Sequence, residues 1–170
     1  ASKYYQYCLN QGFNDSIIFS NYGIIMKSFG KLKEAEILQR KAIENEPYFA
    51  DAHNNLGNTL RDLGKLEEAK VSFQKAIELN PRFAFAFYNL GSTLRDLGKL
   101  TEAEISIRKA IEFNAKNATW YSDLGSILVD LGKLKEAEIL TRKAIELKPD
   151  FAEAYSNLGN IVKDLNRLDE

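Results

Sequence analysis

The sequence predicts an all-α solenoid of antiparallel helix pairs, because a segment of about 34 residues, the length of a helical hairpin, repeats along the whole chain. The tripeptide Gly-Lys-Leu recurs at this step, beginning at Gly30, Gly64, Gly98 and Gly132, and Lys-Ala-Ile-Glu begins at Lys41, Lys75, Lys109 and Lys143. The prolines occupy one phase of the repeat, where they cannot continue a helix: Pro47, Pro81 and Pro149.

The repeat divides the chain into six segments. We expect the second helix of a preceding hairpin at 1–15, complete hairpins at 16–49, 50–83, 84–117 and 118–151, and the first helix of a further, incomplete hairpin at 152–170. Within 1–15, Tyr5 stands at the phase of Gln39 in the next second helix. With half a hairpin at each end, the chain is expected to be a piece of a longer array or to stack head to tail with its own copies.

The first helix of each hairpin carries an apolar stripe. The alternating Phe and Ala that follow Pro81 resemble a β-strand, but the corresponding segments of the other hairpins do not alternate. Apolar residues recur instead at steps of three and four, which indicates a helix: Phe87, Leu90, Gly91, Leu94 and Leu97. The Gly of each Gly-Lys-Leu can adopt the left-handed conformation that ends a helix, and Asn166 is expected to do the same in the last segment.

The second helix of each hairpin also has one apolar face. Between Thr101 and Asn114 that face consists of Ala103, Ile107, Ala110 and Ile111. Small residues recur where the two helices of a hairpin are expected to cross, since larger side chains would push the backbones apart. These residues are Gly57, Gly91, Gly125, Ala69, Ala103 and Ala137.

The hairpin at 84–117 and its successor depart from the pattern. Ala115 replaces the proline, and Asn117 stands where the other hairpins have Phe. Trp120 stands where they have Ala. Because protein interiors contain few voids, we expect Trp120 to fill the volume of the missing Phe.

Composition excludes several classes of protein. The net charge is −1 at pH 7, without the basic excess that phosphate binding requires, so we expect no nucleic-acid partner. No apolar run approaches the ~18 residues that span a bilayer, so we expect no membrane partner. Cys8 is the only cysteine, which excludes an intrachain disulfide framework and makes the cytoplasm the default location. At a phase occupied elsewhere by Ala, Cys8 is expected to be an inert small hydrophobe.

Catalytic chemistry finds little support. His53 is the only histidine and stands at a phase occupied elsewhere by aromatic residues, so it is expected to pack rather than bind metal. A recurring row of carboxylates is typical of a solvated face rather than an acid–base pair: Glu34, Glu68, Glu102 and Glu136. We therefore expect no enzyme activity, no metal and no cofactor.

The repeated residues resemble the tetratricopeptide repeat family over essentially the whole chain. The best-matching hairpin carries the family pattern at Leu56, Gly57, Leu60, Gly64, Ala69, Phe73, Ala76 and Pro81. The family usually has Trp or Tyr near the start of the first helix, where this hairpin has His53. The resemblance implies a right-handed superhelical solenoid whose first helices line a concave groove.

Carried over to this chain, the resemblance places a row of polar side chains along the groove. The row is Asn21, Asn55, Asn89, Asp123 and Asn157, with Asn54, Asn58 and Asn160 beside it. A carboxamide both donates and accepts hydrogen bonds, so such a row could bind the backbone of an extended peptide. It resembles the asparagine ladder in the repeat domain of the O-linked N-acetylglucosamine transferase. The alternative is that these asparagines only connect neighbouring repeats.

Basic and aromatic residues complete the predicted peptide-binding groove. Arg61 and Arg95, at the phase of Lys27 and Lys163, either pair with Asp residues of adjacent repeats or bind an acidic peptide. Phe85 and Tyr88 are expected to face the groove as interface hot spots. The family's carboxylate clamp for chaperone tails matches poorly, because its phases carry Phe85 and Asn89, or Thr119 and Asp123.

The function that we expect is a non-catalytic scaffold that binds a protein or peptide in the groove. Two alternatives stay open. The chain could be the substrate-recruiting arm of a larger enzyme such as a glycosyltransferase, or a structural solenoid that assembles head to tail through its terminal half-hairpins.

Overall fold

The computed structural model describes residues 3–5, 7, 11–12 and 14–168. The chain forms two compact units, Ala1–Asn89 and Leu90–Glu170, here called unit 1 and unit 2. Cys8 lies outside the described residues, as does much of the predicted helix at 1–15. Of that segment, residues 3–5 and 7 are helical, and the ring of Tyr5 stacks on Tyr22 with centroids 6.1 Å apart.

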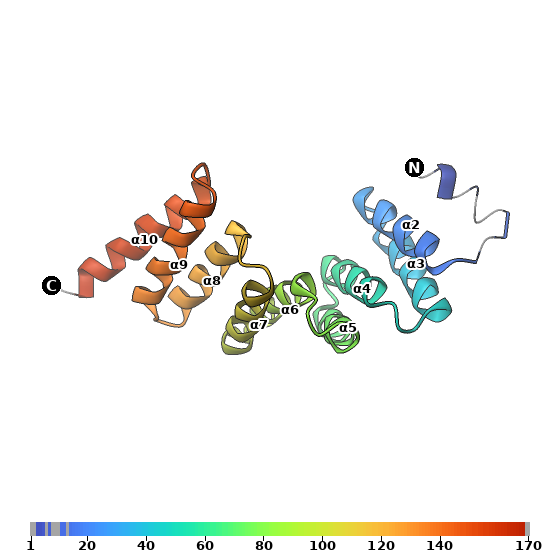
Figure 1. The fold of residues 1–170 in the computed structure, drawn as a ribbon, viewed down its shortest axis with the longest axis horizontal. Helices are drawn as coiled ribbons and strands as arrows, with labels where there is room; N and C mark the ends of the chain where they lie inside the picture. Colours follow the sequence, from blue (N-terminus) through green and yellow to red (C-terminus); the bar gives the residue numbers. More distant parts are fainter. Residues whose placement is uncertain (1–2, 6, 8–10, 13, 169–170) are drawn as a thin grey trace. The chain divides into compact units, whose positions relative to one another are not determined.

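Helices account for most of the described residues, and no strand occurs among them (Figure 1). Their bounds are α2 Ser16–Ser28, α3 Leu32–Asn45, α4 Ala50–Asp62, α5 Leu66–Leu79, α6 Ala84–Asp96, α7 Leu100–Phe113, α8 Ala118–Asp130, α9 Leu134–Leu147 and α10 Ala152–Leu168. In unit 1, α2 packs on α3 and α4 on α5; in unit 2, α8 contacts α7, α9 and α10. The strand-like segment after Pro81 is therefore helical, as the repeat predicts.

Glycines end four of the first helices by adopting a left-handed backbone conformation. Gly30, Gly64, Gly98 and Gly132 have φ between 73° and 76°. The prediction for Asn166 is wrong, because α10 continues through it to Leu168 and no described non-glycine residue has positive φ. A side chain makes the left-handed conformation costly, and an unbroken helix keeps its hydrogen bonds instead.

The helices of each complete hairpin cross so closely that a glycine is required at the crossing. A Cβ atom placed on Gly57 would lie 2.6 Å from Phe73 Cε1, and one on Gly91 would lie 2.5 Å from Ile107 Cγ1. On Gly125 it would lie 2.5 Å from Thr141 Oγ1. The predicted role of these glycines is confirmed. Gly159 on α10 differs, since no described atom lies within 4 Å of such a Cβ.

The third complete hairpin forms its turn without proline. α7 ends at Phe113, and Asn114 accepts the backbone N–H of Lys116 at 3.3 Å. Asn117 is the N-cap of α8, because its Oδ1 accepts the backbone N–H of Thr119 at 3.1 Å and of Trp120 at 3.4 Å. Trp120 is only 2% exposed, which agrees with the expectation that its ring fills core volume.

Salt bridges connect successive second helices within each unit. In unit 1, Glu36 accepts from Arg40 at 2.8 Å and Lys65 at 2.9 Å. In unit 2, Glu104 accepts from Arg108 at 2.8 Å and Lys133 at 2.7 Å. Two carboxylates of the row predicted from sequence join these networks, since Arg40 also binds Glu68 and Arg108 also binds Glu136.

These networks lower the pKa values of Glu36 and Glu104. Burial alone would raise each pKa, but the hydrogen bonds and positive charges of two bases outweigh it. The side chains are only 14% and 9% exposed, so solvent screens the interaction incompletely.

We predict that Gly57→Ala destabilises the protein by about 1–3 kcal/mol, because the new Cβ overlaps the buried ring of Phe73. Gly159→Ala is the matched control: it adds the same methyl group to an open helix surface and should stabilise by up to about 1 kcal/mol. Urea unfolding of both variants measures the difference. Equal effects of the two substitutions would contradict the close crossing.

We predict that Glu36 and Glu104 make the free energy of unfolding decrease as the pH falls into the acidic range. A carboxyl group whose pKa is lowered by folding stabilises the folded protein at any pH above its pKa in the unfolded chain, which is about 4.5. This stabilisation is lost as the pH falls through the pKa of the folded protein. The double variant Glu36→Gln, Glu104→Gln should be less stable than the parent at pH 7, with a smaller difference near pH 3.5. Urea unfolding at both pH values tests this prediction. Glu44→Gln is the control, because Glu44 is exposed and forms no ion pair with a described residue.

Candidate functional site

The predicted site residues all lie on first helices of the hairpins. In unit 1 they are Asn21 on α2, Asn54, Asn55, Asn58 and Arg61 on α4, and Phe85, Tyr88 and Asn89 on α6. In unit 2 they are Arg95 on α6, Asp123 on α8, and Asn157 and Asn160 on α10. We call the surface that they occupy in each unit its first-helix face.

In unit 1, asparagine side chains connect successive first helices. Asn55 Nδ2 donates to Ser20 Oγ at 3.1 Å, which joins α4 to α2. Asn89 Nδ2 donates to Asn54 Oδ1 at 3.0 Å, which joins α6 to α4. Asn54 is buried at 8% exposure, and its Oδ1 is used in this contact between repeats.

The same connection recurs in unit 2. Asn157 Nδ2 on α10 donates to two hydroxyl oxygens of α8, at 3.2 Å to Ser122 and 3.3 Å to Ser126. The alternative role that the sequence left open, a contact between repeats, is therefore observed for these Nδ2 groups. Among the described residues, no group donates to Oδ1 of Asn55 or Asn157, so each carboxamide keeps an acceptor.

A hollow lies beside this connection in unit 2. Its volume is about 210 Å³, and it is lined by Ser126, Val129, Asp130, Asn157, Asn160 and Ile161. Two predicted site residues, Asn157 and Asn160, thus come together at one concave place. Of the other polar site residues, Asn21, Asn58 and Asp123 are each half-buried.

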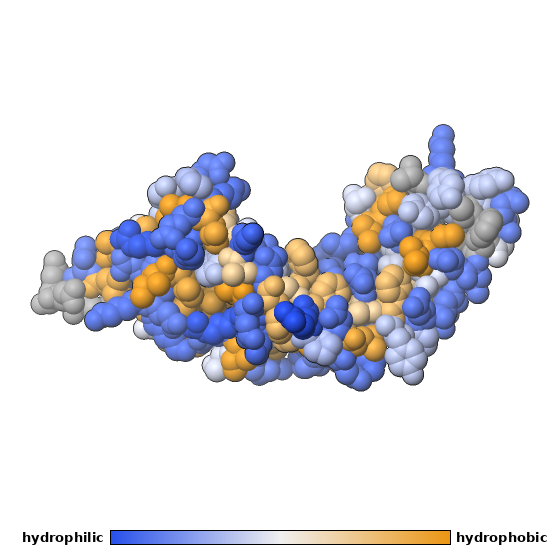
Figure 2. Space-filling model, in the orientation of Figure 1, coloured by the Kyte–Doolittle hydropathy of each residue, from blue (hydrophilic) through white to orange (hydrophobic). Residues whose placement is uncertain are grey.

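Apolar side chains accompany the polar row in unit 1. Phe85 is 52% exposed, and Tyr88 is half-buried. On α2, Ile17 and Ile24 are exposed as well. On the side of the molecule that Figure 2 shows, charged and polar residues divide the apolar surface of each unit into small areas.

The basic residues of the first-helix faces differ in whether they form ion pairs with described residues. Lys27 Nζ binds Asp62 at 2.9 Å, so the pairing between adjacent repeats that the sequence offered is realised there. Arg61 and Arg95 are half-buried and form no ion pair with a described residue. The donors of their guanidinium groups are therefore not engaged by any acidic side chain among the described residues.

Metal chemistry finds no support in the described part of the chain, where no cluster of three His, Cys, Asp or Glu side chains could hold an ion. His53 is half-buried, and its Nε2 lies 3.0 Å from the carbonyl oxygen of Pro47. Nor does any described helix combine the length and the apolar character that crossing a membrane demands.

Sequence reasoning missed the hydroxyl partners of the asparagine row. Ser20 and Ser122 stand one residue before the row, a phase at which Asn54 also occurs. A short polar residue at that phase, followed one repeat later by Asn, is the signal that could have identified these contacts. It also missed a row of exposed apolar residues on the second helices: Ile37, Val71, Ile105 and Ile139.

Family models described as tetratricopeptide repeats match residues 50–83, 72–105 and 125–166. Together they cover more than half of the chain, which therefore belongs to the tetratricopeptide repeat family. Among curated protein sequences, none matches the chain.

Solved structures share the fold. The MamA protein is 26% identical with a TM-score of 0.79, covering 87% of this chain and 81% of its own. YrrB, described as a tetratricopeptide protein with an unusual peptide-binding site, is 25% identical with a TM-score of 0.81. The match covers 98% of this chain and 86% of YrrB. The first tetratricopeptide domain of Spaghetti, bound to an HSP90 peptide, is 28% identical with a TM-score of 0.67. The match covers 69% of this chain and 93% of that domain. The fold is thus a tetratricopeptide solenoid, the architecture of a protein-interaction scaffold.

Proposed function

We propose that the chain binds an extended peptide segment of a partner protein on its first-helix faces. The observation that carries this proposal is the hydrogen bonding of the Asn55 and Asn157 side chains. Each carboxamide is held by an Nδ2 hydrogen bond to a serine of the preceding repeat, while its Oδ1 accepts no hydrogen bond from a described residue. An acceptor held in place in this way can bind a peptide N–H with little loss of side-chain entropy.

Side chains around the acceptors would supply affinity. Phe85 and Tyr88 offer aromatic surface of the kind that dominates interface energies. Arg61 can pair with a carboxylate of the ligand, since no described residue occupies its guanidinium group. In unit 2, the hollow beside Asn157 and Asn160 can receive a small ligand side chain. Backbone recognition by Asn and anchoring by aromatic rings favour an extended peptide with at least one apolar residue.

The structural neighbours support peptide binding as a class. One is described as having a peptide-binding site, and another binds an HSP90 peptide. The particular ligand of the latter is not expected here. The phases of the carboxylate clamp carry Phe85 and Asn89, or Thr119 and Asp123, which lack the cations needed for a terminal carboxylate. A recruiting arm of a larger enzyme would use the same faces to bind its substrates.

We predict that peptides selected from a displayed random library bind the parent protein and lose affinity in the triple variant Asn55→Ala, Tyr88→Ala, Asn89→Ala. Tyr88→Ala alone should weaken binding by about 1–3 kcal/mol, because an aromatic anchor is lost. Isothermal titration with the selected peptides measures these changes.

The matched control is Ile105→Ser, which alters an exposed residue on a second helix and should leave binding unchanged. Circular dichroism and urea unfolding establish that each variant stays folded. If no peptide is enriched on the parent, or if the triple variant binds as well as the parent does, the first-helix faces are not the site.

Head-to-tail assembly is the second candidate, and the open surface of α10 favours it. No described atom would contact a Cβ on Gly159, whereas the corresponding glycines of complete hairpins are covered by a second helix. Tyr155 is 51% exposed, whereas Tyr121 at the same phase is 9% exposed. This surface therefore has the features that accept a second helix, which another copy of the chain could supply.

We predict that, if this assembly occurs, the weight-average mass rises with protein concentration in sedimentation equilibrium, and that Gly159→Trp prevents the rise by blocking the surface of α10. Ile105→Ser is the control, because Ile105 is an exposed residue of α7 and does not belong to the surface of α10. A constant monomer mass at all concentrations would exclude assembly in solution.

A further inference from the structure

A second hollow lies in unit 1 on the side of the second helices. Its volume is about 400 Å³, and it is lined by Arg40, Ile43, Glu44, His53, Leu56, Val71, Ser72 and Lys75. These residues come from α3, α4 and α5, and none belongs to the predicted peptide-binding groove. The hollow is therefore a separate site from the first-helix face.

Two smaller side chains account for the hollow. In the hairpin at 118–151, Tyr121 and Leu140 pack together with Ile111 in one apolar cluster. In the hairpin at 16–49, the same phases carry Phe19 and Leu38, which also share a cluster. The hairpin at 50–83 has His53 and Ser72 at these phases. Volume that an aromatic ring and a leucine side chain occupy in the hairpins at 16–49 and 118–151 is thus left open.

His53 Nε2 and Ser72 Oγ both contact carbonyl oxygens of the protein backbone. His53 Nε2 lies 3.0 Å from the carbonyl oxygen of Pro47, and Ser72 Oγ donates to the carbonyl oxygen of Glu68 at 3.0 Å. Neither group needs a ligand to satisfy these atoms. The apolar residues Ile43, Leu56 and Val71 therefore determine what the hollow favours.

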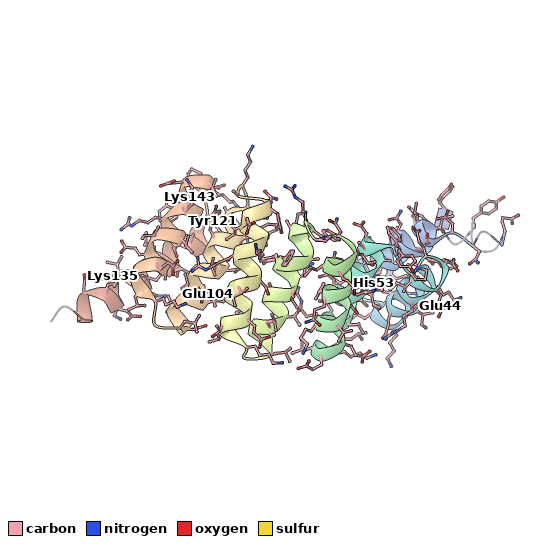
Figure 3. All side chains as sticks on the ribbon, turned by 60° about the horizontal axis from the view of Figure 1, so that its bottom comes forward. Glu44, His53, Glu104, Tyr121, Lys135 and Lys143 are labelled. Carbon is pink, nitrogen blue, oxygen red and sulfur yellow. The ribbon has the colours of Figure 1, made fainter. Side chains whose placement is uncertain are left out.

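A lysine stands at the same phase in the hairpin at 50–83 and in the hairpin at 118–151, where Tyr121 and Leu140 fill the corresponding volume. Lys143 binds Glu146 at 2.7 Å, and its pKa is raised, mainly by that hydrogen bond and to a smaller extent by interaction with Tyr121 (Figure 3). Lys75 stands at the corresponding phase and binds Glu78 at 2.9 Å. Lys75 thus places a charged ammonium group at the rim of the open hollow.

We propose that this hollow binds the side chain of a tyrosine presented by a partner protein. Its ring would occupy the volume that Tyr121 and Leu140 fill in the hairpin at 118–151, against Ile43, Leu56 and Val71, and its hydroxyl group would accept a hydrogen bond from Lys75. A phenol suits the site better than an aliphatic group, because the rim offers a charged donor above an apolar floor. The site is independent of the peptide-binding faces, so the chain could contact one partner on two sides or two partners at once.

The experiment uses 4-methylphenol, which is the tyrosine side chain itself, as a probe in a ¹H–¹⁵N NMR titration of the 170-residue chain. We expect shifts confined to amides of α3, α4 and α5 around the hollow. The double variant His53→Tyr, Ser72→Leu copies the filled hairpin and should lower probe affinity by roughly tenfold or more. It should also raise the Tm by about 2 °C or more, because a void is filled with apolar volume.

Two further variants keep the test decisive. Asn55→Ala, on the first-helix face, should bind the probe like the parent. Val71→Asn changes an exposed wall residue, 60% exposed, and should weaken binding without unfolding the chain, which decides the matter if the double variant fails to fold. Shifts that are absent from the hollow in the parent, or unchanged in Val71→Asn or in a folded double variant, would overturn the proposal.

Discussion

The close crossing of the two helices within each hairpin is the constraint on which the rest of the structure depends. At Gly57 the backbone of α4 approaches the ring of Phe73 so nearly that a single methyl group does not fit. Because the crossing fixes each first helix against its second helix, the phase of every other residue in the repeat is fixed as well. Which residues face the neighbouring repeat, the core or solvent then follows from their place in the repeat.

Polar side chains join successive hairpins through both the first helices and the second helices. On the first helices, the amide of Asn55 reaches a serine of the preceding repeat. On the second helices, Glu36 and Glu104 each gather a base from their own repeat and one from the next. Within each unit the hairpins are thus joined by polar contacts as well as by apolar packing. The polar row on the first helices is therefore both a structural connection and a candidate ligand surface.

Departures from the repeat are informative because the repeat itself sets the expectation. Asn117 and Trp120 replace Phe and Ala, and the pair keeps a capped helix and a filled core. His53 and Ser72 stand where the hairpins at 16–49 and 118–151 have an aromatic residue and a leucine, and a hollow lies beside them. Gln39 is completely buried where Phe73 and Ile107 stand, and no described residue bonds its amide. A compensated change preserves the fold, whereas an uncompensated one marks a place where the surface can differ in function.

The sequence by itself determined the helical hairpins, their order and the glycines at the crossings, because these depend on periodicity and on the size of local residues. It also placed the asparagine row on the first helices. Only the tertiary structure decided that Asn55 and Asn157 bond to serines while each keeps an acceptor, since that depends on side-chain distances between repeats. The structure likewise corrected Asn166, where the helix continues, and revealed the hollow beside His53. A hollow depends on the combined volumes of side chains from several helices, so the residue pattern of one helix does not predict it.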